Sequence, residues 1–156
     1  MLAAYLPDLL AIAVAAFTAP PWNETALDAT GAGIRLVRDR MESGYVAALA
    51  RIDEQACGFA YAVSARRLER LATRTTSIAP PFELRELAVD PRYRGLGIGA
   101  GMHDALISAR PDTPRYLVTH PAAHAALALY RARGWRSTAV IEHWQTGPRL
   151  LMHRFH

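Results

Sequence analysis

Four glycines alternate with other residues in the segment GLGIGAG at positions 95–101, and this segment constrains the fold most strongly. It follows the apolar run 87–89, which Asp90-Pro91 ends, and it precedes residues with a helical apolar pattern that reach Pro111. A strand that passes through glycines into a helix gathers backbone N–H groups around one point, and the helix dipole adds positive potential there. Glycine lets oxygens approach the backbone closely and adopts positive φ. The segment predicts a phosphate-binding turn, and a tight turn that binds nothing is the alternative.

Two helices are predicted near the amino terminus. Over residues 6–17 apolar side chains recur every three or four positions, which is the spacing of an amphipathic helix, and Pro20-Pro21 ends it. A second helix begins after Thr25, with Asp28 as a capping partner, and extends towards Met41.

The pattern then changes to that of strands. Residues 45–52 and 57–63 are rich in β-branched, aromatic and small side chains and flank a polar turn, so they predict a hairpin. The arginine-rich residues 66–81 form a connector with at most a short helical turn. Residues 82–89 predict the next strand, because the following Asp90-Pro91 cannot extend a ladder.

The last third of the chain alternates between the two patterns. Residues 115–120 predict a strand, and residues 121–133 predict a helix with Pro121 in its first turn and Gly134 at its end. Residues 137–144 and 149–155 predict a terminal hairpin. This order of elements indicates an α/β (α+β) fold with a mixed sheet and helices on both faces.

Composition limits the class of protein. A chain of 156 residues that is 51% hydrophobic fits a single domain over 1–156. All 18 basic residues are Arg, which indicates the codon bias of a GC-rich genome rather than a selected arginine surface. The net charge of +4 suits an anionic partner. Cys57 is the only cysteine, so we expect no disulfide, no metal site and a cytoplasmic protein. Residues 1–20 have no basic segment typical of a signal peptide, and no run predicts a membrane span.

Two familiar phosphate-binding motifs fit poorly. A P-loop needs a lysine after its last glycine, and this chain has none. A Rossmann fingerprint can be aligned with Gly95, Gly97 and Ala100, but the next strand ends at His120 and too little chain remains for that fold.

The segment LAVDPRYRGLGIG, residues 87–99, resembles the acyl-CoA signature of the GNAT superfamily of N-acyltransferases, with Arg94 at the head of its glycine turn. ALALYRARGW, residues 126–135, is similar to the second landmark of that superfamily. Together they imply a GNAT-like, largely antiparallel sheet that splays between two strands. The resemblance implies a cofactor site formed by Leu87, Ala88, Val89, Arg94, Gly95, Leu96, Gly97, Ile98, Gly99 and Ala100.

The implied activity is an N-acetyltransferase, in which a primary amine of a small molecule or peptide attacks acetyl-CoA directly. A catalytically inactive CoA-binding regulatory module is the alternative. Tyr130 is the implied proton donor to the departing thiolate. For the general base we favour Glu83, then Glu86, then a water chain. Glu83 and Glu86 are three positions apart and lie on opposite faces of an ideal strand unless a bulge intervenes.

The acceptor is expected to bind near Trp22, Asn23 and Glu24, with the segment 142–144 lining the same cleft. Carboxylates are scattered, which argues against a polycationic acceptor. The chain departs from the superfamily in two places: Ala123 stands where an Asn upstream of the tyrosine is usual, and the usual first strand is missing or cut down to residues 1–6. We expect acetyl-CoA and an amine as partners, with no membrane and a homodimer left open.

A nucleic-acid partner is suggested only by Arg66, Arg67, Arg70 and Arg74 in the connector. No aromatic platform accompanies these four side chains. A solvated loop explains them, so we expect no nucleic acid.

Overall fold

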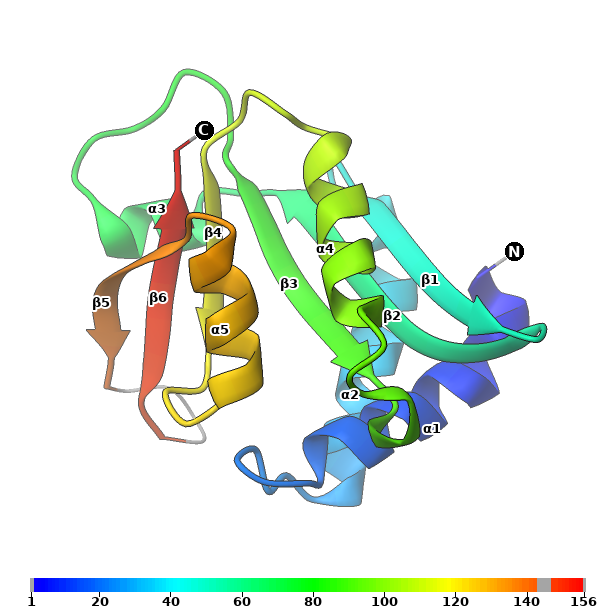
Figure 1. Cartoon of the computed structure of the whole chain (residues 1–156). Coiled ribbons are helices and arrows are strands. Elements are labelled where there is room, and N and C mark those ends of the chain that lie inside the picture. Colours follow the sequence, from blue (N-terminus) through cyan, green and yellow to red (C-terminus); the bar gives the residue numbers. More distant parts are fainter. Residues whose placement is uncertain (1, 143–146, 156) are drawn as a thin grey trace.

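The computed structural model describes residues 2–142 and 147–155 (Figure 1). Its helices are α1 (Leu6–Phe17), α2 (Ala26–Arg38), α3 (Arg67–Ala72), α4 (Ile98–Ser108) and α5 (His124–Ala132), with the 3-10 turns η1 (Leu2–Tyr5), η2 (Asp39–Met41) and η3 (Pro91–Tyr93). Its strands are β1 (Val46–Ile52), β2 (Gln55–Ser64), β3 (Phe82–Val89), β4 (Arg115–Thr119), β5 (Arg136–Ile141) and β6 (Arg149–Arg154). None of the described helices is long and apolar enough to cross a membrane.

The described strands form one six-stranded sheet in the order β1-β2-β3-β4-β6-β5. Every neighbouring pair is antiparallel except β3 and β4, which are parallel. The predicted mixed, largely antiparallel sheet is therefore confirmed. The strands follow the order of the chain except at the end, where β6 lies between β4 and β5 and β5 forms the edge of the sheet.

Helices cover both faces of the sheet, as predicted, with α4 and α5 on one face and α1 and α2 on the other (Figure 1). The face under α1 and α2 buries Leu9, Ile12, Ala13, Leu36, Phe59, Tyr61 and Val63. The face under α4 and α5 buries Leu84, Met102, Leu106, Leu117, Leu127, Tyr130, Trp135 and Met152. A smaller cluster of Leu68, Tyr116 and Leu151 packs α3 against β4 and β6.

Local signals explain the start of α2 and the end of α5. The side chain of Thr25 accepts a hydrogen bond from the Asp28 N–H at 3.1 Å and so caps α2 at the predicted position. Gly134, with φ of +85°, lies just beyond α5 as expected. The prediction that Pro121 lies in the first turn of α5 is wrong, because residues 121–123 form a turn and the helix begins at His124.

A bulge in β3 changes which side chains share a face. Tyr61 of β2 pairs with Glu86 of β3, whereas the next residue, Ala62, pairs with Leu84, so Arg85 has no partner in the ladder. One extra residue in a strand reverses the alternation beyond it. Glu83 and Glu86 therefore lie on the same face, which is the exception that the sequence interpretation had allowed.

The parallel pairing of β3 with β4 covers only Phe82, Glu83 and Leu84. Beyond Leu84 the two strands separate, and Figure 1 shows β3 diverging from β4 towards its carboxyl end. The splayed sheet implied by the family resemblance is thus present. The backbone of residues 86–89 faces this opening on its β4 side.

Truncating Leu36 tests the core under α1 and α2. Leu36 is 0% exposed, so Leu36→Ala should lower the free energy of unfolding by about 2–5 kcal/mol. Leu27 lies on the same helix but is 82% exposed, so Leu27→Ala should change it by less than about 0.5 kcal/mol. Urea unfolding measures both, and equal losses would contradict the placement of α2.

Candidate active site

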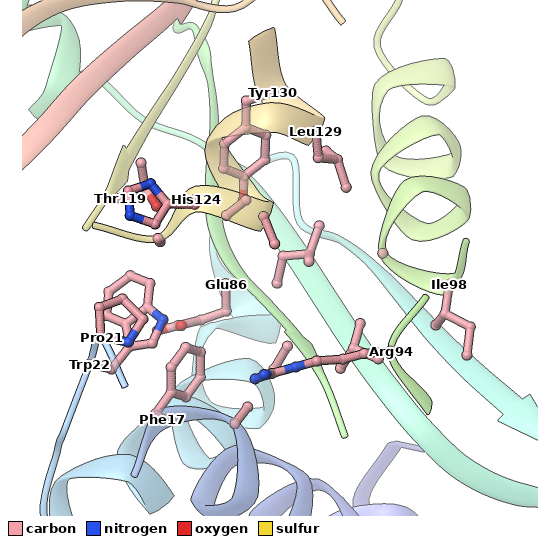
Figure 2. A pocket seen from close by; sticks show the side chains of 18 of the residues that line it. Phe17, Pro21, Trp22, Glu86, Arg94, Ile98, Thr119, His124, Leu129 and Tyr130 are labelled. Atoms are coloured by element: carbon pink, nitrogen blue, oxygen red, sulfur yellow. The ribbon is translucent and has the colours of Figure 1, made fainter. Parts of the chain in front are cut away.

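A cavity of about 550 Å³ fills the opening between β3 and β4. Its walls come from the end of α1 and the loop after it, from β3, from the glycine turn, and from α5 (Figure 2). Of the predicted cofactor residues, Leu87, Ala88, Val89, Arg94, Gly95, Gly97, Ile98, Gly99 and Ala100 line it. Leu96 does not line it and is 64% exposed.

The glycine turn forms one end of the cavity. Gly95 and Gly97 both have φ of +77°, and a β-carbon added at either would meet no atom within 4 Å. Their need for glycine is therefore conformational, and the space beside them is open to a ligand. Gly97 is the N-cap of α4 and provides no side-chain cap, so the first backbone N–H groups of the helix remain directed to this end.

Arg94 stands at the head of the turn. Its side chain is exposed, and Figure 2 shows its guanidinium extending into the cavity. A guanidinium beside uncapped helix N–H groups makes a site for an anion such as a phosphate.

Tyr130 lies on the opposite wall, near the end of α5. It is 7% exposed, and its ring contacts those of His103 and Trp135, with centroid distances of 6.2 and 6.0 Å. Burial raises the pKa of its phenol, so the hydroxyl keeps its proton at neutral pH. Tyr130 can therefore donate a proton into the cavity.

Glu86 lies at the centre of the labelled side chains in Figure 2. Its Oε1 accepts hydrogen bonds from Arg35 Nε at 3.0 Å and from Arg35 Nη2 at 2.6 Å. Burial raises the pKa of this carboxyl, although the Arg35 guanidinium opposes the change. A carboxylate with a raised pKa is a better proton acceptor near neutral pH than an ordinary one.

Glu83 has a different environment. It is 0% exposed, and its Oε1 accepts a hydrogen bond from the backbone N–H of Leu68 at 2.8 Å, close to the start of α3. Its Oε2 is buried and lies 3.5 Å from Arg85 Nε. Glu83 lines the adjoining cavity but not the one that contains Tyr130 and the glycine turn, whereas Glu86 lines both.

A second cavity of about 890 Å³ adjoins the first. Phe17, Trp22, Leu84, Arg85, Glu86 and Val118 line both cavities. Glu24 lines the second, and burial raises its pKa against the opposing charges of Arg35 and Arg149. Asn23 lines neither and is exposed.

Trp22 stands where the two cavities meet. Its ring makes edge contacts with Phe17 and His120, with centroid distances of 5.4 and 5.6 Å. The guanidinium of Arg149 lies over the same ring at 5.5 Å. These contacts hold the loop after α1 against the ends of β4 and β6.

Some site features had no signal in the sequence. The pairing of Arg35 with Glu86 joins residues 51 positions apart, and nothing in either segment indicates it. The segment 142–144 was expected to line the acceptor cleft beside Trp22. Glu142 is exposed and lines neither cavity, whereas His143 and Trp144 lie outside the described residues. Within residues 2–142 and 147–155, no cluster of His, Cys, Asp and Glu could hold a metal ion.

Comparisons with known proteins agree with this geometry. The model of the acetyltransferase (GNAT) family matches residues 6–135. A solved structure titled ribosomal-protein-alanine N-acetyltransferase from Brucella melitensis is similar, with 26% identity and a TM-score of 0.74 over 98% of this chain and 95% of that chain. No curated protein sequence matches the chain.

Two further structures share the fold at lower identity. The PaiA N-acetyltransferase of Thermoplasma acidophilum, solved in complex with coenzyme A, is 16% identical, with a TM-score of 0.65 over 98% of this chain and 94% of that one. Ard1 of Thermoplasma volcanium is 20% identical, with a TM-score of 0.67 over 96% and 91%. By the family match over most of its length and by its splayed sheet, the chain belongs to the GNAT acetyltransferase family.

Proposed function

We propose that this protein transfers the acetyl group of acetyl-CoA to a primary amine by direct attack of that amine. The observation that carries the proposal is the position of Glu86. Glu86 lines both the cavity that ends at the glycine turn and the adjoining cavity. A cofactor and an acceptor bound in the two cavities would therefore meet beside it.

The residues present fit acetyl-CoA. The uncapped start of α4, the open space at Gly95 and Gly97, and the Arg94 guanidinium suit a pyrophosphate. The β3 backbone beyond Leu84 is unpaired on its β4 side and suits the amides of a pantetheine arm. When bound, acetyl-CoA supplies an acetyl group activated as a thioester.

Glu86 is the proposed general base. An amine is mostly protonated at neutral pH, because the pKa of an alkyl ammonium lies near ~10, and it must lose a proton before it attacks. The carboxylate accepts that proton, either directly or through a water. Arg35 holds Glu86 in place through two hydrogen bonds to Oε1.

Tyr130 is the proposed general acid. A departing thiolate is a better leaving group when it receives a proton, and Tyr130 lines the cofactor cavity with its phenol protonated. Glu86 removes a proton at the amine and Tyr130 supplies one at the sulfur. After the attack the nitrogen of the tetrahedral adduct must lose a second proton, which returns to the Tyr130 phenolate, directly or through water. Of the two protons that leave the nitrogen, one then remains on Glu86 and one is on the CoA thiol, so the transfer balances.

For the acceptor we propose the α-amine of a peptide. The second cavity, about 890 Å³, has room for more than a small amine, and Trp22 and Glu24 line it. The similar Brucella melitensis protein is titled as an enzyme that acetylates alanine of a ribosomal protein. An ammonium group in this cavity would meet the carboxylates of Glu24 and Glu86, the second of which is already paired with Arg35.

Thermal unfolding with acetyl-CoA, followed by thiol release with a panel of amines, tests the proposal. Acetyl-CoA at ~100 times its Kd should add about 2.7 kcal/mol of stability and raise Tm by several degrees. Peptides with a free amino terminus should release thiol faster than the same peptides blocked at that position. Binding without turnover on any amine would indicate a regulatory module instead.

Gly97→Ala tests the glycine turn. A β-carbon at φ of +77° is strained by about 1–2 kcal/mol and would crowd the proposed pyrophosphate, so acetyl-CoA affinity should fall at least tenfold. Gly101→Ala is the matched control, because Gly101 lies within α4, has open space at its β-carbon and no strained φ. Calorimetric titration measures both, and equal affinities would place the pyrophosphate elsewhere.

Glu86→Gln tests the base. A base acts only when deprotonated, so wild-type activity should fall as the pH decreases through the raised pKa of Glu86, above the usual value for a carboxyl. At a pH above this pKa, kcat/KM of the wild type should exceed that of the variant about 10²–10⁴-fold, and this ratio should decline as the pH falls through the pKa. Glu83→Gln should keep the decrease of activity at low pH. The opposite outcome for the two variants would assign the base to Glu83.

A further inference from the structure

A fully buried histidine lies behind Tyr130. His103 is 0% exposed, and its Nε2 lies 2.9 Å from the indole nitrogen of Trp135, which is also 0% exposed. Its Nδ1 lies 2.8 Å from Asp104 Oδ1. Asp104 in turn accepts hydrogen bonds from Arg133 at 2.6 and 3.0 Å.

Trp135 determines which nitrogen of His103 carries the proton. An indole N–H can only donate, so Nε2 must accept, and the proton of the neutral ring lies on Nδ1, where it is donated to Asp104. A doubly protonated ring would set two N–H donors against each other at Trp135. The arrangement is therefore satisfied only by the neutral ring.

The two hydrogen-bonded rings, those of His103 and Trp135, both contact the ring of Tyr130. Tyr130 lies 6.2 Å from the His103 ring and 6.0 Å from the Trp135 ring, between centroids. The backbone carbonyl of Tyr130 also accepts hydrogen bonds from the N–H groups of Arg133 and Trp135. A shift of Trp135 would therefore move both the ring contacts and the backbone of Tyr130.

His103 and Asp104 lie on α4, whereas Tyr130 lies on α5 and Arg133 and Trp135 lie just after it. The first turn of α4 carries the uncapped N–H groups beside Gly97. The bond from Trp135 to His103 thus ties the helix that begins at the glycine turn to the segment that carries Tyr130.

We propose that His103 is a positioning residue, which holds Trp135 and through it fixes the ring of Tyr130 against the cofactor cavity. The proposal rests on the assignment of Tyr130 as general acid. It adds that the tyrosine is held in place from α4 and works only while the buried histidine is neutral.

Charges around His103 act on the same proton. Burial lowers the pKa of His103, Asp104 on α4 opposes it by favouring the protonated ring, and Arg133 after α5 and Arg154 on β6 act in the same direction as burial, so that the pKa is lowered. Tyr130 is protonated and adds no charge. Loss of the Trp135 bond is therefore expected only as the pH falls below about 6.5, the usual His pKa.

A double-mutant cycle separates positioning from a general structural role. His103→Leu removes both hydrogen bonds and should lower kcat about tenfold while KM for acetyl-CoA changes less than about twofold. In the Tyr130→Phe background the same change should cost less than about twofold, because the group it positions is gone. If His103→Leu lowers kcat by the same factor in the wild-type and Tyr130→Phe backgrounds, the proposal is overturned.

His103→Gln is the conservative variant, since its amide oxygen can still accept from Trp135, and it should keep kcat within about threefold of wild type. If His103→Leu does not fold, Trp135→Phe replaces it in the cycle with the same expectation, because it removes the donor and keeps an aromatic, though smaller, ring at this buried position. His153→Gln, on β6, controls for loss of a histidine elsewhere and should leave kcat unchanged.

A readout without turnover separates this proposal from the proposed function. In protein labelled with ¹³C-tyrosine, the Tyr130 ring signals, assigned by their loss in Tyr130→Phe, should shift with the titration of His103 and not shift in His103→Gln. This holds whether or not any amine is acetylated. Tyr130 signals that ignore the His103 titration would overturn the positioning role, whereas absent thiol release with coupled signals would overturn only the enzymatic assignment.

Discussion

The separation of two parallel strands is the constraint from which the site follows. β3 and β4 pair over only three residues, and the sheet opens beyond Leu84. Because both strands remain held by their outer neighbours, β2 and β6, the opening does not unravel either half of the sheet. Helices α4 and α5 then cover the same face on the two sides of the gap, and the cavity forms between them.

The bulge at Arg85 coincides with this opening and decides which carboxylate faces it. Without the extra residue, Glu86 would lie on the face of Leu84, packed beneath α4 and α5, and Leu87 would lie on the opposite face. With it, Glu86 joins the face of α2 and meets Arg35. One unpaired residue in a strand therefore places a charged side chain at the junction of two cavities instead of in an apolar core.

The sequence predicted the features that depend on local chemistry. The glycines before Ile98 mark the start of α4 because only they adopt φ of +77° without strain, and Thr25 marks the start of α2 by its capping bond. The bulge could not be predicted, because it depends on how β3 pairs with β2. The sequence therefore could not show which face of the sheet Glu86 occupies, and the preference for Glu83 was made without that information. His103 is similar: on an apolar helical face it is typical of a core residue, and only the fold brings Trp135 to it from 32 positions away.

The position of β6 bears on how the molecule assembles. β6 is hydrogen-bonded to β4 on one side and to β5 on the other, so β5 joins the described sheet only through a strand that follows it in the chain. During synthesis, β3, the glycine turn and α4 can form before residues 149–154 leave the ribosome. β4 and β5 cannot be joined until then. The wall that carries Tyr130 should thus be the last part of the site to become ordered, because its supporting strands come together late.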